Sequence, residues 1–181
     1  MAVNYQLELE RELQKNEGKT PRLLLHCCCA PCSSYVLEYL SPHFSITAHY
    51  YNPNIDTPEE YAHRARELSR FVQEMPLPGA VDVLAEPYTP AEFYAAVKGL
   101  EDVPEGGRRC HECYRLRLRR AAQAAAAGGY DYFTTTLSIS PHKNAVWLGE
   151  LGEAFAAEYG VRWLPSDFKK KNGFKRSTEL A

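Results

Sequence analysis

The chain is 181 residues long, 45% hydrophobic and 24% charged, with a formal net charge of −2 at pH 7. This length suits one α/β domain, and the mild acidity argues against a generally basic nucleic-acid-binding coat. No run approaches the roughly 18 to 20 apolar residues that span a bilayer, and the polar N-terminus lacks the apolar core of a signal peptide. We therefore expect a cytoplasmic protein without a membrane partner.

Strand-like and helix-like segments alternate along the chain. The pattern predicts helices at 4–16, from 33, at 57–74, 89–99, 114–127 and 141–159, and strands at 22–26, 44–51, 81–86, 130–136 and 161–164. Thr57-Pro58-Glu59-Glu60 and Thr89-Pro90-Ala91-Glu92 are capping boxes that start two of these helices. This alternation predicts a three-layer α/β/α domain with a mostly parallel sheet.

The six cysteines fall into two groups, Cys27-Cys28-Cys29-Ala30-Pro31-Cys32 directly after the first predicted strand and Cys110-His111-Glu112-Cys113 far downstream. Neighbouring cysteines rarely pair as disulfides, and reduced cytoplasmic thiols more often bind metal or act in catalysis. The doublet and the Cys-x-x-Cys pair offer four thiolates to one soft metal centre, either structural zinc or an iron–sulfur cluster. Because one half is a doublet and not a second Cys-x-x-Cys knuckle, the spacing favours iron–sulfur.

Two cysteines are left over. Cys27 belongs to the end of the strand, where we expect a buried, inert thiol. Cys32 opens the following helix, whose N-terminal dipole lowers the pKa of a thiol, so Cys32 is a candidate metal ligand or redox thiol. In an open parallel sheet, ligands bind outside the carboxyl ends of the strands, and we expect the loop bearing Cys110 and Cys113 to fold over that edge.

Other polar segments are candidates for binding. Thr134 to Asn144 leads from a predicted strand into a helix, where free N–H groups, Ser140 and Lys143 would make an anion site, although an ordinary helix cap explains them too. Asp167 is a candidate proton donor, with a loop cap as the simpler alternative. Arginines surround the second cysteine pair, and lysines gather near the C-terminus. We expect these basic side chains either to bind phosphates or simply to lie on solvated surfaces.

Four blocks of sequence occur in an order that is typical of one known family. They are residues 24–33 (LLHCCCAPCS), 51–55 (YNPNI), 109–118 (RCHECYRLRL) and 133–144 (FTTTLSISPHKN). From about residue 22 to its end, the chain resembles the QueH type of epoxyqueuosine reductase.

The resemblance implies an enzyme of tRNA modification, an oxidoreductase that reduces the epoxide of epoxyqueuosine to queuosine at the wobble position, in the last step of queuosine biosynthesis. It implies a [4Fe-4S] cluster held by Cys28, Cys29, Cys110 and Cys113, and an additional mononuclear iron with Cys32 as its candidate ligand. The implied fold is related to the adenine-nucleotide α-hydrolase (HUP) group. Residues 1–20 would be a helical extension, and residues 21–181 a single iron–sulfur reductase domain.

The resemblance also implies roles and partners. Cys32 and Asp167 are candidate catalytic residues, and Tyr51 or Tyr114 would stack on an extruded base. The candidate substrate-binding residues are Asn52, Asn54, Arg117, Ser140 and Lys143. The expected partners are a tRNA with epoxyqueuosine in its anticodon loop and an external electron donor.

Two further expectations stand beside this one. Many members of the family continue with a C-terminal segment that carries a redox cysteine pair, and this chain ends about where that segment would begin. The chain is then either truncated there or works without those thiols. From a different class of function, a zinc-stabilised, non-catalytic RNA-binding module would use the same thiols and basic patches.

Overall fold

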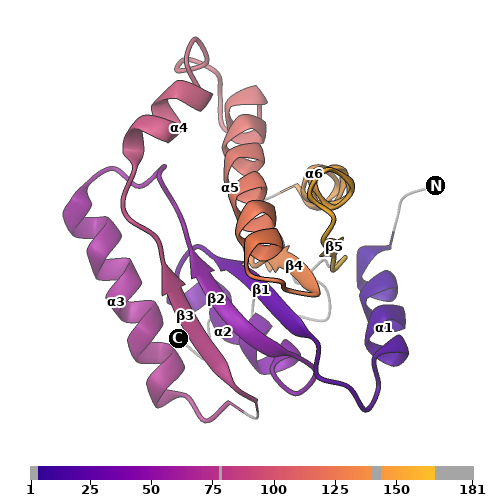
Figure 1. Ribbon diagram of the computed structural model, residues 1–181. Helices are drawn as coiled ribbons and strands as arrows, with labels where there is room; N and C mark the ends of the chain where they lie inside the picture. The colour runs from indigo at the N-terminus through magenta and orange to yellow at the C-terminus, as the bar shows by residue number, and fades with distance from the viewer. Residues whose placement is uncertain (1–3, 78, 140–143, 166–181) are drawn as a thin grey trace.

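The computed structural model describes residues 4–77, 79–139 and 144–165, and the alternation of strands and helices is present in them (Figure 1). The strands are β1 (Arg22–Cys27), β2 (Ser45–Tyr50), β3 (Val81–Ala85), β4 (Tyr132–Thr135) and β5 (Arg162–Trp163). The helices are α1 (Tyr5–Lys15), α2 (Ala30–Leu40), α3 (Pro58–Glu74), α4 (Pro90–Ala96), α5 (Arg108–Ala127), the 3-10 turn η1 (Leu137–Ile139) and α6 (Ala145–Tyr159). Among these helices, none is both long enough and apolar enough to cross a membrane.

The strands form one sheet in the order β3-β2-β1-β4-β5, and every neighbouring pair is parallel. In β1, Leu24 lies opposite Thr47 of β2 on one side and Phe133 of β4 on the other. The chain runs outward from β1 to β2 and β3, and then returns to build β4 and β5 on the other side of β1. The carboxyl ends of β1 and β4 therefore form a topological switch point, the place where open α/β sheets bind ligands.

Helices cover both faces of the sheet, which confirms the predicted three-layer α/β/α fold (Figure 1). Leu23 and Leu25 of β1 pack into a core with α2 and α3, whereas Leu24 packs into a second core with α5 and α6. Successive side chains of a strand point to opposite faces, so a strand covered on both faces has to be apolar throughout. The central position of β1 therefore explains its apolar run.

Helix α1 contributes to the first of these cores. Leu9 is fully buried there, and Gln6 Nε2 donates a hydrogen bond to Tyr39 Oη of α2 at 3.2 Å. Tyr132 Oη of β4 donates to Glu12 Oε2 at 2.8 Å. The N-terminal helix is thus packed on the sheet and on α2.

The start of α5 differs from the prediction. The helix begins at Arg108, six residues before the expected Tyr114, because Gly106 (φ +89°) completes the loop and Gly107 is already the N-cap. Cys110 and Cys113 therefore lie in the first turns of a helix and not in a loop.

Two other helix starts also differ, and one predicted capping bond is missing. Helix α2 begins at Ala30, three residues before the expected residue 33. Helix α6 begins at Ala145, and not at Pro141, because Asn144 is its N-cap and accepts a hydrogen bond from Trp147 N at 3.1 Å. Pro141 itself lies outside the described residues. Thr89 precedes α4 but makes no capping hydrogen bond with its side chain, whereas Thr57 does cap α3 by accepting from Glu60 N at 3.1 Å.

Candidate metal centre

The first cysteine group lies at the switch point. β1 ends at Cys27, and Cys29 is the N-cap of α2, so the chain passes from strand to helix within two residues.

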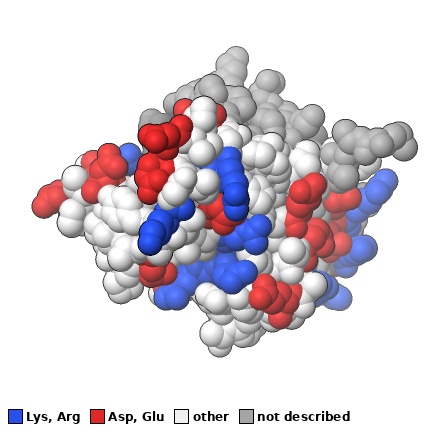
Figure 2. All heavy atoms as spheres, turned by 90° about the horizontal axis from the view of Figure 1, so that it is seen from above, with Lys and Arg blue, Asp and Glu red and all other residues white. Residues whose placement is uncertain are grey.

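Figure 2 shows the molecule from above, the side on which α4 and the first turns of α5 lie in Figure 1. Basic side chains gather in the middle of this face, with acidic side chains around them.

Three thiols are close enough to share one ion. The Sγ atoms of Cys28, Cys29 and Cys32 all lie within 4.8 Å of one another, and Cys28 Sγ is 3.9 Å from Cys29 Sγ. A tetrahedral ion with sulfur ligands at about 2.3 Å separates them by about 3.8 Å. The six cysteines of the chain are free thiols, so the donor set suits a soft metal.

At this spacing, ionisation of one thiol suppresses that of its neighbours. Hydrogen bonds from Cys29 and Cys32 lower the pKa of Cys28 well below its usual value, although burial opposes the shift. The same contact with Cys28 raises the pKa of Cys29 to about 12, and the pKa of Cys32 is raised further by its contacts with Cys28 and Cys29. In this arrangement of free thiols, the hydrogen-bonding contacts of Cys32 with Cys28 and Cys29, together with burial, outweigh the predicted lowering of its pKa by the helix dipole.

The second cysteine pair reaches the same edge from α5. Cys28 and Cys110 pack against the same core cluster, on the α5 and α6 side of the sheet, and Cys113 is buried. Gly106 N–H donates to Cys110 Sγ at 3.3 Å. Among the described residues, the group of sulfurs within 4.8 Å contains neither Cys110 nor Cys113. A cubane cluster needs wider spacing than a single ion, because each cysteine binds a different iron, so the four-thiolate set stays a prediction.

Both cysteine segments begin helices in the same way. Cys29 and Cys32, like Cys110 and Cys113, are three residues apart in the first turns of a helix, which places each pair on one helix face. Neither N-cap, Cys29 or Gly107, uses a side chain to bond the first N–H groups. These groups and the two dipoles favour negative charge, so thiolates and an anionic iron–sulfur centre fit this edge. The Cys29-x-x-Cys32 spacing is present in the sequence. It was not used in the prediction, because Cys29 was paired with its neighbour Cys28.

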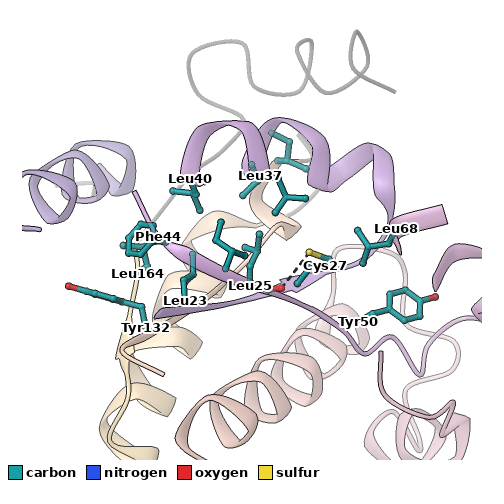
Figure 3. Close-up of a cluster of buried hydrophobic side chains, with 14 of the residues drawn as sticks. Leu23, Leu25, Cys27, Leu37, Leu40, Phe44, Tyr50, Leu68, Tyr132 and Leu164 are labelled. Atoms are coloured by element: carbon teal, nitrogen blue, oxygen red, sulfur yellow. Dashed lines mark hydrogen bonds between the residues drawn. The ribbon is translucent and has the colours of Figure 1, made fainter. Parts of the chain in front are cut away.

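Cys27 faces the other side of the sheet (Figure 3). It is fully buried, its Sγ donates to Leu25 O at 3.4 Å, and burial raises its pKa. The predicted burial of Cys27 is confirmed, and its inertness stays a prediction.

His26 holds the strand ends together and stays neutral. Its Nε2 lies 2.9 Å from Tyr51 O, and since a carbonyl only accepts, Nε2 carries the proton and Nδ1 accepts from Thr135 Oγ1 at 2.9 Å. Burial, together with the charge of Arg117, lowers the pKa of His26 to about 3. His26 is therefore a positioning residue and not a proton donor near neutral pH.

Asn52 and Arg117, two of the predicted substrate-binding residues, lie together near the end of β1. Asn52 Nδ2 donates to Cys27 O at 3.0 Å, and Arg117 Nη1 donates to Asn52 Oδ1 at 3.4 Å. They are only 1% and 4% exposed, so their role in substrate binding stays a prediction. The third, Asn54, has a buried Oδ1 without a hydrogen-bond partner in the described structure. Ser140, Lys143 and Asp167 lie outside the described residues.

The aromatic residues expected to stack on a base are buried. Tyr51 and Tyr114 are 1% and 3% exposed, and Tyr51 Oη donates to Glu92 Oε2 at 2.7 Å. That expectation is wrong, because both rings pack inside the fold. Of the large apolar side chains exposed in the described ranges, Tyr94 of α4 is the aromatic one, at 61%. It sits on a short helix with no periodic pattern, so nothing in the sequence marked it.

Cys29 can be reached from solvent. Together with Pro31 it lines a groove of about 970 Å³ between α2 and α3, which Arg64 and Phe71 line from the α3 side. A soluble reductant or a thiol reagent can therefore reach Cys29 through this groove.

The chain matches one family along most of its length. A family model described as epoxyqueuosine reductase QueH matches residues 23–181. The chain is 41% identical to the epoxyqueuosine reductase QueH of Streptococcus pyogenes serotype M1, a match that covers 98% of this chain and 71% of the relative. It is also 41% identical to that of Staphylococcus epidermidis, over 98% of this chain and 77% of the relative. It is 31% identical to that of Thermotoga maritima, a match that covers 88% of this chain and 81% of the relative. These matches confirm the resemblance drawn from the four sequence blocks.

Proposed function

This chain belongs to the epoxyqueuosine reductase QueH family, and we propose that it reduces the epoxide of epoxyqueuosine in tRNA to the cyclopentene of queuosine. The observation that supports this most directly is the concentration of cysteines at the switch point. Three thiols follow β1, and two more lie in the first turns of α5, where Cys110 packs against the same core cluster as Cys28. The overall reaction takes up two electrons and two protons. Both C–O bonds of the epoxide break, a C=C bond forms, and the oxygen leaves as water.

In this proposal, Cys28, Cys29, Cys110 and Cys113 hold a [4Fe-4S] cluster, and Cys32 is a ligand of an additional mononuclear iron. When bound, the cluster supplies single electrons taken from an external donor, and a further iron supplies Lewis acidity. The donor set fits these groups because all of these cysteines are free thiols, and three of them lie close enough to share one ion.

Other residues fix the backbone around the first cysteine group. Asn52 holds the carbonyl of Cys27, and His26 ties the end of β1 to Thr135 of β4 and to the backbone of Tyr51. These contacts fix the start of the cysteine run relative to both neighbouring strands. Both ring nitrogens of His26 are occupied by these two hydrogen bonds.

The tRNA would approach the side of the molecule on which α4 and the first turns of α5 lie (Figure 1). Tyr94 of α4 and Arg108, the first residue of α5, are exposed. An exposed tyrosine stacks on an unpaired base, and arginine binds phosphate, which is how single-stranded anticodon loops are held. The modified base would then be turned into the crevice. We place this activity in the cytoplasm, where thiols stay reduced.

The zinc-stabilised, non-catalytic RNA-binding module is not favoured, because the family and the relatives are named as reductases. Metal content separates it from the reductase. Protein purified without oxygen should hold about four or more irons with matching sulfide and absorb broadly in the visible. Given an external reductant, it should convert epoxyqueuosine-containing tRNA to a product nucleoside that has lost one oxygen atom. One zinc, no sulfide and no conversion would make the site structural.

A further inference from the structure

Arg117 is a buried cation to which no described residue supplies a counter-charge. It is 4% exposed, and the hydrogen bond that it makes among the described residues, at 3.4 Å, goes to the neutral amide of Asn52. Its Nε has no partner among those residues, and the ring of Tyr114 lies 6.0 Å away. In the part of the chain that the structure describes, no carboxylate lies within the 4.0 Å of an ion pair from its guanidinium.

Other arginines on this stretch of α5 do have a carboxylate partner. Arg120 binds both oxygens of Glu86, and Arg119 is exposed and lies 4.0 Å from Glu158. Burying a guanidinium with neither water nor a counter-charge costs several kcal/mol, and arginine cannot escape that cost by losing its proton. The position therefore calls for an anion that no Asp or Glu of residues 4–77, 79–139 or 144–165 supplies.

The groups around Arg117 identify that anion. Arg117 follows Cys113 by four residues, so the two lie on the same face of α5. Through Asn52 it is joined to the carbonyl of Cys27, immediately before Cys28. Arg117 therefore lies beside the two segments that carry Cys28 and Cys113. A cluster bound by four thiolates carries net negative charge that grows on reduction.

We propose that Arg117 is the buried counter-charge of the metal centre and raises its reduction potential. A fixed positive charge in a site of low dielectric constant stabilises the more negative, reduced form of a centre beside it. Arg117 acts through the centre and is a positioning residue, with no contact to substrate. The inference rests on the proposed function, because it requires that a redox centre be bound.

The test compares Arg117→Gln, which removes the charge, with Arg117→Lys, which keeps it. Arg119→Gln is the matched control, since it removes the same charge from the exposed side of the same helix. Midpoint potentials are measured on oxygen-free protein by redox titration with EPR detection. Arg117→Gln should shift the reduction equilibrium at least tenfold toward the oxidised form, about 59 mV for a one-electron couple. Arg117→Lys and Arg119→Gln should stay within about threefold of the unsubstituted protein, roughly half that shift.

A second measurement needs no loaded centre. After removal of metal, Arg117→Gln should melt at or above the temperature of the unsubstituted protein, because a buried, unpaired charge has gone. Loaded Arg117→Gln should instead lose iron to a chelator faster. Failure of Arg117→Gln to hold any cluster, with a folded apoprotein and a loaded Arg117→Lys, supports the inference as well.

Two results overturn it, and they are distinguishable. Equal potentials in loaded Arg117→Gln and Arg119→Gln, or an Arg117→Gln apoprotein that is much less stable, refute the role of Arg117 alone. Absence of iron and sulfide from the unsubstituted protein refutes the proposed function and the inference together.

Discussion

Arg120 binds Glu86 through both carboxylate oxygens, with Nη2 at 2.6 Å from Oε1 and Nε at 3.1 Å from Oε2. The same carboxylate is hydrogen-bonded to His49 Nε2, on a ring that is fully buried. Glu86 follows β3, His49 belongs to β2 and Arg120 to α5, so one carboxylate joins two strands to the helix that carries the second cysteine pair. It secures α5 over the carboxyl edge of the sheet.

This network makes stability depend on acid pH. Burial alone would raise the pKa of Glu86, but hydrogen bonds from His49 and Arg120 outweigh it and lower the pKa to about 2, from an ordinary value of 4.5. Between these values the unfolded chain takes up a proton that the folded chain does not. The stabilisation is therefore complete above pH 4.5 and is lost as the pH falls toward 2.

Glu86→Gln should accordingly lower the free energy of unfolding by about 1–2 kcal/mol at pH 7, allowing for partial exposure. Urea unfolding at pH 7 and 5 should give the same difference, and at pH 3 a smaller one. Glu60→Gln, which breaks an exposed ion pair with Arg64, is the control and should change little. A difference for Glu86→Gln that is independent of pH would contradict the assignment.

Gly152 makes room for Trp163. A Cβ at Gly152 would lie 2.2 Å from the indole, which is buried between α6 and the sheet and has little freedom to move. Gly152→Ala should destabilise the fold by about 1–3 kcal/mol, even though alanine favours a helix. Gly149→Ala meets only the outer end of the Tyr5 ring, which can turn aside, so its loss should be smaller. Thermal unfolding ranks the two, and the reverse order would refute this account of α6 packing.

The cysteines of the chain should differ sharply in what their loss does. Cys110→Ala should abolish cluster binding and epoxide reduction while leaving a soluble, folded protein, because alanine suits the first turn of α5. Cys27→Ala removes a sulfur from the same run as the proposed ligands but on the opposite face, so iron and sulfide should stay at the level of the unsubstituted protein. Iron, sulfide and circular dichroism are measured on both. Full activity in a cluster-free Cys110→Ala protein would rule out the mechanism.

Tyr94 should contribute to tRNA binding. Stacking of one base on an aromatic ring is worth about 1–3 kcal/mol, so Tyr94→Ala should raise the Kd for substrate tRNA roughly 5- to 150-fold. Tyr94→Phe keeps the ring and should bind like the unsubstituted protein. The cysteines lie elsewhere, so iron content should be equal in both variants. Unchanged tRNA binding by Tyr94→Ala would remove α4 from the interface.

The sheet was predictable because its signals are local. The apolar run of β1 and the capping box at Thr57 mark their elements within a few residues, and alternation along the chain then implies parallel strands. The position of Cys28 and Cys29 at the carboxyl edge followed directly from the strand before them. The start of α5 was missed because Gly106 and Gly107 indicate a loop, and a loop was extended through cysteines that belong to a helix.

What could not be predicted depends on contacts between distant segments. His49 and Glu86 are 37 residues apart, and the sequence around either residue does not indicate that the two are in contact. The ionisation of the thiols was likewise misjudged. The dipole of α2 is readable from sequence, but the distance between Cys28 and Cys32 that overrides it exists only in the fold.

The place of β1 in the sheet also bears on how the protein is made. Cys28 and Cys29 leave the ribosome early, but β1 remains open on one side until β4, ending at Thr135, has been synthesised and has docked. Roughly 100 residues separate them, which takes about 5–20 s of translation. During that time the thiols have neither α5 nor β4 beside them. Whatever metal this edge receives must arrive after most of the chain exists, and the nascent cysteines depend on the reducing power of their surroundings until then.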